Sequence, residues 1–138
     1  MVPVAINVRP GGFPNSINLN TDAALAALTT RVGEYGLPPA FDATAIDVFQ
    51  TYWGLREPLF NTATPAGARE VHGRGHPDDS YELDERTRDR DTDLLPHFKP
   101  SESGLDLAST RACLKGKYRT AGGQLYTYLG CDSVGVVN

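Results

Sequence analysis

The sequence predicts an all-β fold: a single β-sandwich-like domain with long loops and a C-terminal, disulfide-linked hairpin. Three observations indicate it. Fourteen glycines and ten prolines are spread among 138 residues, and such frequent turn residues interrupt helices. Short β-branched or alternating runs lie between these turns. The composition, 40% hydrophobic and 22% charged, is typical of a soluble domain, and 138 residues are enough for one core, so residues 1–138 are expected to form a single domain.

The N-terminal half begins with a β-branched run, residues 2–8, which ends at the turn sequence of residues 9–12 (RPGG). Residues 13–20 alternate apolar and polar side chains, but their proline and asparagines favour an extended segment over a central strand. Residues 22–28 (DAALAAL) have helix propensity yet are too short for a stable helix, so a helical turn and a buried strand both remain open. Residues 48–55 are rich in aromatics and predict a strand.

The C-terminal half contains a polar loop and a meander. Residues 73–93 are strongly polar but are flanked by apolar segments, so we expect an ordered loop held by ligands or salt bridges. Residues 112–118 and 124–129 flank the turn residues Ala121-Gly122-Gly123 and predict a hairpin, and residues 131–137 close the chain.

Both cysteines lie in this last third, at positions 113 and 131. Two free buried thiols are one possibility, but an even count in a turn-rich chain favours a Cys113–Cys131 disulfide. A zinc site is disfavoured because the C-x-x-C spacing is missing.

The net charge of −4 argues against a nucleic-acid-binding protein, which would present a basic face. No apolar run approaches the ~20 residues that span a bilayer, so no membrane span is predicted. A disulfide forms in an oxidising compartment, so we expect an extracellular or cell-surface protein. No basic-then-apolar signal peptide is present, and a signal would have been removed or left out of this numbering.

Several motifs resemble, in order, a domain of secreted bacterial proteins whose usual pattern contains PGSxPNSIN, VPVAIL, FDATTVD and DxDxDxDLVLHF. The matching stretches here are residues 6–18 (INVRPGGFPNSIN), 23–28 (AALAAL), 41–47 (FDATAID), 93–98 (DLLPHF), 112–116 and 130–134. The resemblance implies an extracellular β-sandwich-like domain of poorly defined function. It also implies that residues 23–30 form a strand.

The acidic segment is the best candidate ion site. Asp89, Asp91 and Asp93 alternate, so an extended chain directs their carboxylates to one side, and Glu85 or Asp84 would complete a site for a hard cation such as Ca²⁺. The resembling family has glycines where this chain has Arg88 and Arg90, which removes backbone freedom and adds positive charge. The alternative is therefore a solvated ladder in which arginines balance the aspartates.

Other candidate chemistry is weaker. His72 and His76 are separated by glycines, so the helical H-x-x-x-H geometry of zinc enzymes fails, and these residues and His97 are expected to form ordinary hydrogen bonds. No serine lies in a G-x-S-x-G elbow, so an enzyme is not expected. A sugar-binding groove could use the aromatics, but their spacing is more typical of core or cross-strand pairs: Tyr52, Trp53, Tyr81, Tyr126 and Tyr128.

Assembly is the favoured function. Residues 1–8 and 134–137 are apolar, β-prone termini, and an unpaired terminal strand can complete a neighbour's sheet. Repeated head to tail, that contact gives a filament. We therefore predict a non-catalytic extracellular subunit of a fibre or surface layer whose partners are copies of itself, joined through an exchangeable N-terminal strand with Val2, Val4, Ile6 and Val8 as contacts. The alternative is a calcium-stabilised carbohydrate- or surface-binding module.

Overall fold

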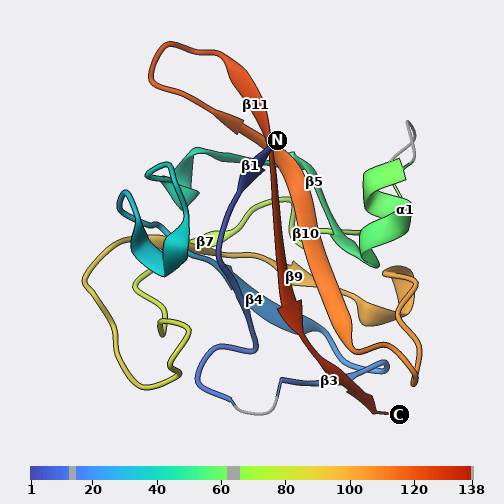
Figure 1. Cartoon of the computed structure of the whole chain (residues 1–138). Helices are drawn as coiled ribbons and strands as arrows, with labels where there is room; N and C mark the ends of the chain where they lie inside the picture. The colour runs from blue at the N-terminus through green and yellow to red at the C-terminus, as the bar shows by residue number, and fades with distance from the viewer. Residues whose placement is uncertain (13–14, 62–65, 138) are drawn as a thin grey trace.

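The computed structural model describes residues 1–12, 15–61 and 66–137, and it consists mainly of β-strands in two facing five-stranded sheets (Figure 1). The predicted all-β, sandwich-like fold is confirmed. Phe13 and Pro14, which belong to the segment predicted as extended, lie outside the described residues.

The first sheet has the strand order β1-β11-β10-β5-β6. It is built on the long strands β5 (Ile46–Gly54), β10 (Arg111–Arg119) and β11 (Leu125–Ser133). Two short strands, β1 (Val2–Pro3) and β6 (Ala68–Arg69), form its edges. The predicted hairpin is confirmed as β10–β11, and its tip projects beyond the rest of the molecule at the top of Figure 1.

The second sheet has the order β2-β4-β8-β7, with β9 also paired to β4. Its strands are β2 (Ile6–Val8), β4 (Ala23–Ala27), β7 (His76–Asp78), β8 (Asp93–Leu95) and β9 (His97–Phe98). Strands β3 (Ser16–Asn18) and β12 (Gly135–Val137) form a separate parallel pair. Residues 22–28, for which the sequence allowed either a helical turn or a strand, therefore contain a strand. The burial of Leu25, Ala26 and Ala27 in the tertiary structure overrides the helix propensity of alanine.

Among the described residues, helical structure is confined to short connections. They are one α-helix, α1 (Arg56–Asn61), and three 3₁₀ turns, η1 (Glu34–Gly36), η2 (Ala43–Ala45) and η3 (Pro100–Glu102). In the described part of the chain, no helix is long and apolar enough to cross a membrane.

The core fills the space between the two sheets. Trp53 of β5 and Phe98 of β9 are fully buried, with ring centroids 5.8 Å apart. The hydroxyls of Tyr128 (β11) and Thr51 (β5) lie 3.0 Å apart, so the polar tip of this buried tyrosine is satisfied. Cys113 and Cys131 face each other across β10 and β11 and form the predicted disulfide.

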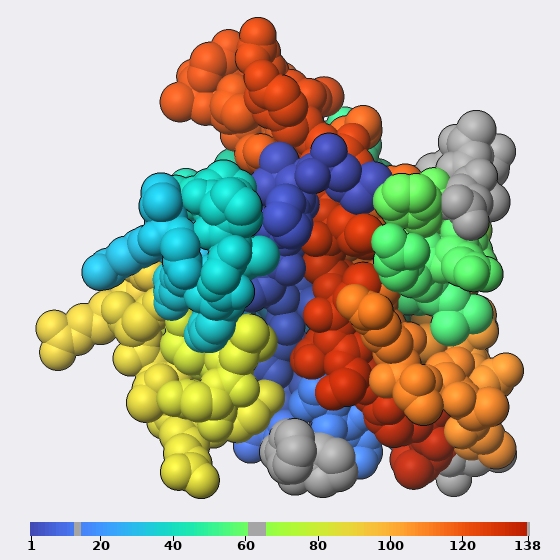
Figure 2. Space-filling model, in the orientation of Figure 1, coloured from blue at the N-terminus to red at the C-terminus, as the bar shows by residue number. Residues whose placement is uncertain are grey.

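The N-terminal segment belongs to both sheets. Strand β1 pairs in parallel with β11, and β2 pairs antiparallel with β4. Val4, Ile6 and Val8 are buried in the chain's own core. The premise that this terminal strand lacks a partner within its own domain is therefore wrong: its β-prone residues find partners in both sheets, and β12 likewise pairs with β3. Figure 2 shows the segment (blue) lying between the loops coloured cyan and yellow and the C-terminal strands coloured red.

Candidate functional site

Carboxylates from three parts of the chain converge around Asp89. One oxygen each of Glu34, Glu82 and Asp89 lie within 4.8 Å of one another, and the same holds for Asp79, Asp89 and Asp93. Asp89 thus joins two overlapping groups, which together we call the acidic cluster: Glu34, Asp79, Glu82, Asp89 and Asp93, with Asp91 beside Asp89.

Strand β8 and the loop before it hold the cluster in place. Asp93, fully buried in β8, accepts hydrogen bonds from the backbone N–H groups of Thr29 (2.8 Å) and Ser80 (2.9 Å). Asp79 accepts one from the Arg90 N–H at 3.0 Å. The hydroxyl of Tyr35, in η1, donates to Glu82 at 2.9 Å. The loop of residues 31–37 is therefore tied to the loop of residues 79–91, which we call the acidic loop.

Several oxygens of the cluster are buried without a partner. Among the described residues, Oδ1 of Asp79, Oε2 of Glu82 and Oδ2 of Asp91 have no hydrogen-bond partner. Glu82 as a whole is only 6% exposed. A buried acceptor that lacks both water and a donor destabilises a fold by roughly 1–3 kcal/mol, and more when it is charged. A bound cation or bound protons would therefore stabilise this arrangement of carboxylates.

The pKa values of the cluster respond to the same crowding. Burial raises the pKa of Glu82 to about 8, and the neighbouring Asp89 and Asp93 carboxylates add to the increase against the Tyr35 hydrogen bond. Burial likewise raises the pKa of Asp93 to about 6, although two backbone N–H groups oppose it. The pKa of Asp89 is lowered, because the hydrogen bonds it accepts, including one from the Asp91 N–H, outweigh its burial. Protons therefore concentrate on Glu82 in the absence of a cation.

The donor set fits a hard cation. It contains only carboxylate oxygens and brings several negative charges together, and two of its residues, Asp79 and Glu82, each have a buried oxygen without a partner among the described residues. Calcium takes six to eight oxygen ligands in flexible geometry, so this cluster with added water would meet its demand.

The structure brings together only part of the predicted ligand set. Asp89 and Asp93 lie in the cluster and Asp91 beside it, but Glu85 lies elsewhere: it accepts hydrogen bonds from Gly11 N–H (2.7 Å) and Asn7 Nδ2 (3.2 Å). Asp84 accepts hydrogen bonds from the backbone N–H groups of Arg86 and Thr87, so its carboxylate closes its own turn. Glu34, Asp79 and Glu82 were not predicted in this site, because local spacing cannot show which distant acids the fold brings together.

The arginine ladder is not seen either. In the part of the chain that the structure describes, no arginine lies within ion-pairing distance of a carboxylate. Arg88 instead stacks on the Tyr81 ring, with its Cζ 4.2 Å from the ring centroid. Arg90 has φ 69°, a left-handed conformation that glycine favours, so the loop keeps the backbone shape expected of a glycine there.

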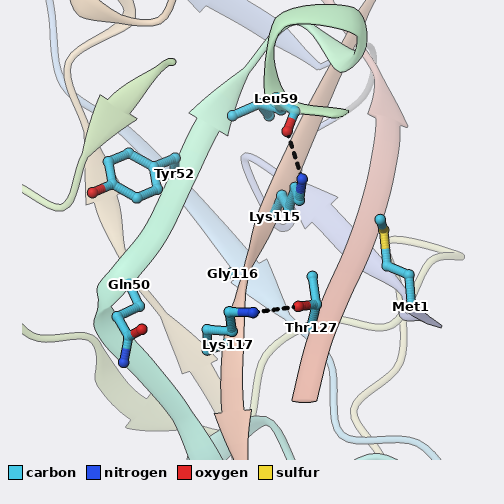
Figure 3. Close-up of a pocket in the computed structure, with 8 residues that line it drawn as sticks. All are labelled: Met1, Gln50, Tyr52, Leu59, Lys115, Gly116, Lys117 and Thr127. Carbon is cyan, nitrogen blue, oxygen red and sulfur yellow. Dashed lines mark hydrogen bonds between the residues drawn. The ribbon is translucent and has the colours of Figure 1, made fainter. Parts of the chain in front are cut away.

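A groove on the outer face of the first sheet is the second candidate site (Figure 3). It has a volume of about 540 Å³ and lies between α1, β5, β10 and β11. Lys115 Nζ donates to the Leu59 carbonyl and Lys117 Nζ to Thr127 Oγ1, each at 2.7 Å, and Tyr52 lines the same wall. Both ammonium groups thus have neutral hydrogen-bond partners, so the groove is positively charged.

The aromatics do not form one sugar-binding groove. Trp53 and Tyr128 are buried in the core, whereas Tyr126 is exposed on the projecting hairpin. Tyr81 packs beneath Arg88 on the acidic loop. Only Tyr52, of the five, lines the basic groove.

Neither a protein-family model nor a curated protein sequence matches this chain. Among solved structures, a bacterial immunoglobulin-like domain from the M. primoryensis ice-binding adhesin is similar, with 11% sequence identity and a TM-score of 0.40. The match covers 99% of this chain and 100% of that domain.

Proposed function

We propose that the chain is a non-catalytic extracellular structural module whose acidic loop is held in place by Ca²⁺. One observation carries the proposal: Asp79 and Glu82, which belong to the two groups that share Asp89, each have a buried carboxylate oxygen without a partner among the described residues. A bound cation would satisfy these oxygens and offset the repulsion among the acids. The Cys113–Cys131 disulfide supports an oxidising, extracellular setting, since such bonds persist there.

Ca²⁺ binding would also stabilise the fold, because the cluster joins β8 to the loops of residues 31–37 and 79–91. A ligand that binds only the folded state at 100 times its Kd stabilises by about 2.7 kcal/mol. The test is a thermal melt of metal-free protein with and without added Ca²⁺. We expect the melting temperature to rise with Ca²⁺ and the rise to disappear in Asp89→Asn.

Asp22→Asn is the matched control, since Asp22 is exposed and lies outside the cluster. It should keep the full response to Ca²⁺. An equal response in the wild type and in Asp89→Asn would contradict the proposal, as would no response at millimolar Ca²⁺.

Assembly through the N-terminal strand remains part of the proposal, in a changed form. Because β1 and β2 pair within the chain, copies would join by exchanging residues 1–8 rather than by adding an unpaired strand. Two features support exchange: the segment lies along the surface in Figure 2, and its buried Val4, Ile6 and Val8 would refill an identical groove in the next copy. Repeated exchange in one direction gives a head-to-tail fibre or surface layer.

The basic groove supports a second candidate function, attachment to acidic glycans. Lys115 and Lys117 offer two positive charges beside Tyr52, which suits a carboxylated or sulfated sugar chain. The experiment compares binding of an acidic polysaccharide by the wild type and by the Lys115→Glu/Lys117→Glu variant, which should bind more weakly. Lys99→Glu is the control, because it makes the same change of charge at one exposed lysine outside the groove. Equal binding by the wild type and the double variant would rule out the groove.

A further inference from the structure

The three histidines of the chain form one cluster. Their ring centroids lie 6.2 Å (His72–His76), 5.8 Å (His72–His97) and 5.8 Å (His76–His97) apart, and each ring meets the others edge to face. One nitrogen of each ring lies within 4.8 Å of the other two. Sheet pairing, rather than helical spacing, brings these three histidines together.

Backbone pairing builds this cluster. His76 opens β7 and is in register with Leu95 of β8, while His97 opens β9, which pairs with β4. The Val71 N–H donates to the His97 carbonyl at 2.9 Å, which places the adjoining His72 beside His97. Between His72 and His76 the chain turns through Gly73, whose φ is 71°. A Cβ on Gly75 would lie 2.7 Å from Leu94, so a side chain there would push the loop away.

A buried carboxylate lies behind the cluster. Glu70, only 8% exposed, accepts hydrogen bonds from the backbone N–H groups of His72 and His97, the latter at 2.7 Å. The same carboxylate lies 3.9 Å from Nδ1 of His72. In metal sites, a carboxylate that accepts a hydrogen bond from the second ring nitrogen orients the imidazole. Glu70 would do this for His72 after a small rotation of that exposed ring, which closes the 3.9 Å separation.

We infer that His72, His76 and His97 form a site for a divalent transition-metal ion, with Zn²⁺ the best fit. Three imidazoles suit Zn²⁺ and related ions, whereas the all-oxygen acidic cluster suits Ca²⁺. His72 and His76 are exposed and His97 is half-buried, with a buried Nδ1 atom that has no partner in the described part of the chain. The site is thus open to solvent on one side, which leaves a fourth position for water or for a ligand from a partner.

Little movement is needed to bind the ion. Tetrahedral Zn²⁺ with bonds of about 2.0–2.1 Å to nitrogen places its ligand atoms about 3.4 Å apart. The present nitrogens lie within 4.8 Å of one another, and rotation of the two exposed rings would bring them closer to that spacing.

The test uses the full chain, purified without a polyhistidine tag, and titrates Zn²⁺ by calorimetry in the presence of Ca²⁺. Co²⁺ serves as a spectroscopic probe, because tetrahedral Co²⁺ absorbs visible light strongly. We expect one Zn²⁺ per chain and affinity that falls at least about 100-fold in His76→Ala, since loss of a ligand exceeds the 10–100-fold effect of changing an outer-shell partner.

Two controls separate this site from the rest of the molecule. Arg74→Ala alters the same loop without removing a ligand and should bind Zn²⁺ as the wild type does. Asp89→Asn should lose the Ca²⁺ response and keep Zn²⁺ binding, so failure of this inference and failure of the calcium proposal are distinguishable. Unchanged metal-free melting temperatures would show that His72→Ala and His76→Ala fold. Zn²⁺ affinity that is the same in the wild type and in folded His76→Ala overturns the inference.

Discussion

Asp132, near the end of β11, accepts a hydrogen bond from the backbone N–H of Val8 at 2.9 Å. The same carboxylate oxygen accepts a second hydrogen bond from Asn15 Nδ2 at 2.8 Å. Burial raises the pKa of Asp132, against the effect of these donors. One half-buried side chain therefore fastens the N-terminal strand, which this chain uses in both sheets, to its C-terminal hairpin.

Removing this acceptor should loosen the N-terminal strand. Asp132→Ala leaves the Val8 N–H and the Asn15 amide without their partner, so we expect a loss of about 2 kcal/mol in the free energy of unfolding. Urea denaturation measures it. Asp106→Ala, which removes a carboxylate from an exposed turn, is the control and should cost less. Equal losses in the two variants would show that Asp132 has no special role.

Deletion of residues 1–8 tests the exchange of strands. The truncated chain loses buried Val4, Ile6 and Val8, at roughly 1.5–3 kcal/mol for each side chain, and should be unfolded and no longer form the head-to-tail assembly. A peptide of residues 1–8 should restore a folded monomer, seen by circular dichroism and light scattering. If the truncated protein polymerises as the intact protein does, strand exchange is not the joint.

The disulfide should contribute measurably to stability. It closes a loop with a sequence separation of 18, for which the chain-entropy model gives about 3 kcal/mol. The double variant Cys113→Ala/Cys131→Ala should therefore have a free energy of unfolding about 3 kcal/mol lower than that of the wild type. It should accordingly unfold at a lower urea concentration. Wild type treated with a reductant provides a second measurement without a change of side chain. No difference in midpoint would contradict the prediction.

Arg90→Gly should stabilise the acidic loop. Arg90 has φ 69°, and a left-handed conformation costs a non-glycine residue roughly 1–2 kcal/mol, partly offset by the entropy that glycine adds to the unfolded chain. We expect a net gain of about 1 kcal/mol and tighter Ca²⁺ binding. Arg86→Gly removes the same charge from the same loop without relieving a positive φ, and it should not stabilise.

As pH rises, the stability of the metal-free protein should fall and the additional stability that Ca²⁺ provides should grow. In metal-free protein, Glu82 and Asp93 have raised pKa values of about 8 and about 6, so the folded state holds protons that the unfolded state releases. The melting temperature should therefore fall as pH rises from about 4.5 to about 8. Ca²⁺ binds the ionised carboxylates, so its stabilising increment should grow over the same window. A pH-independent increment, measured by thermal melts, would show that Ca²⁺ binds elsewhere.

Much of the fold follows from local sequence. Turn residues at 9–12 and 121–123, the alternation in residues 124–129 and the aromatic run at 48–55 all predicted elements that the structure contains. These signals are local because a turn needs particular backbone angles and a strand needs alternating faces. The disulfide was predictable from the sequence, because an even number of cysteines in a turn-rich chain favours a disulfide over free thiols.

The candidate sites depended on contacts that no local pattern encodes. Asp89 and Asp93 were identified from their spacing, but Glu34 comes from a separate loop, which the Tyr35 hydroxyl ties to Glu82. The helical spacing test rejected the histidines, although pairing of β7 and β9 with neighbouring strands brings them together.

By itself, the sequence determined that this protein is a turn-rich, disulfide-linked β domain with an acidic loop, because those properties follow from residue type and short-range order. Only the tertiary structure decided that the N-terminal strand pairs within its own chain and which acids and histidines meet. Those outcomes depend on burial and on pairing between distant segments, as between Val8 and Asp132, which are 124 residues apart. Sequence spacing carries no record of such distances.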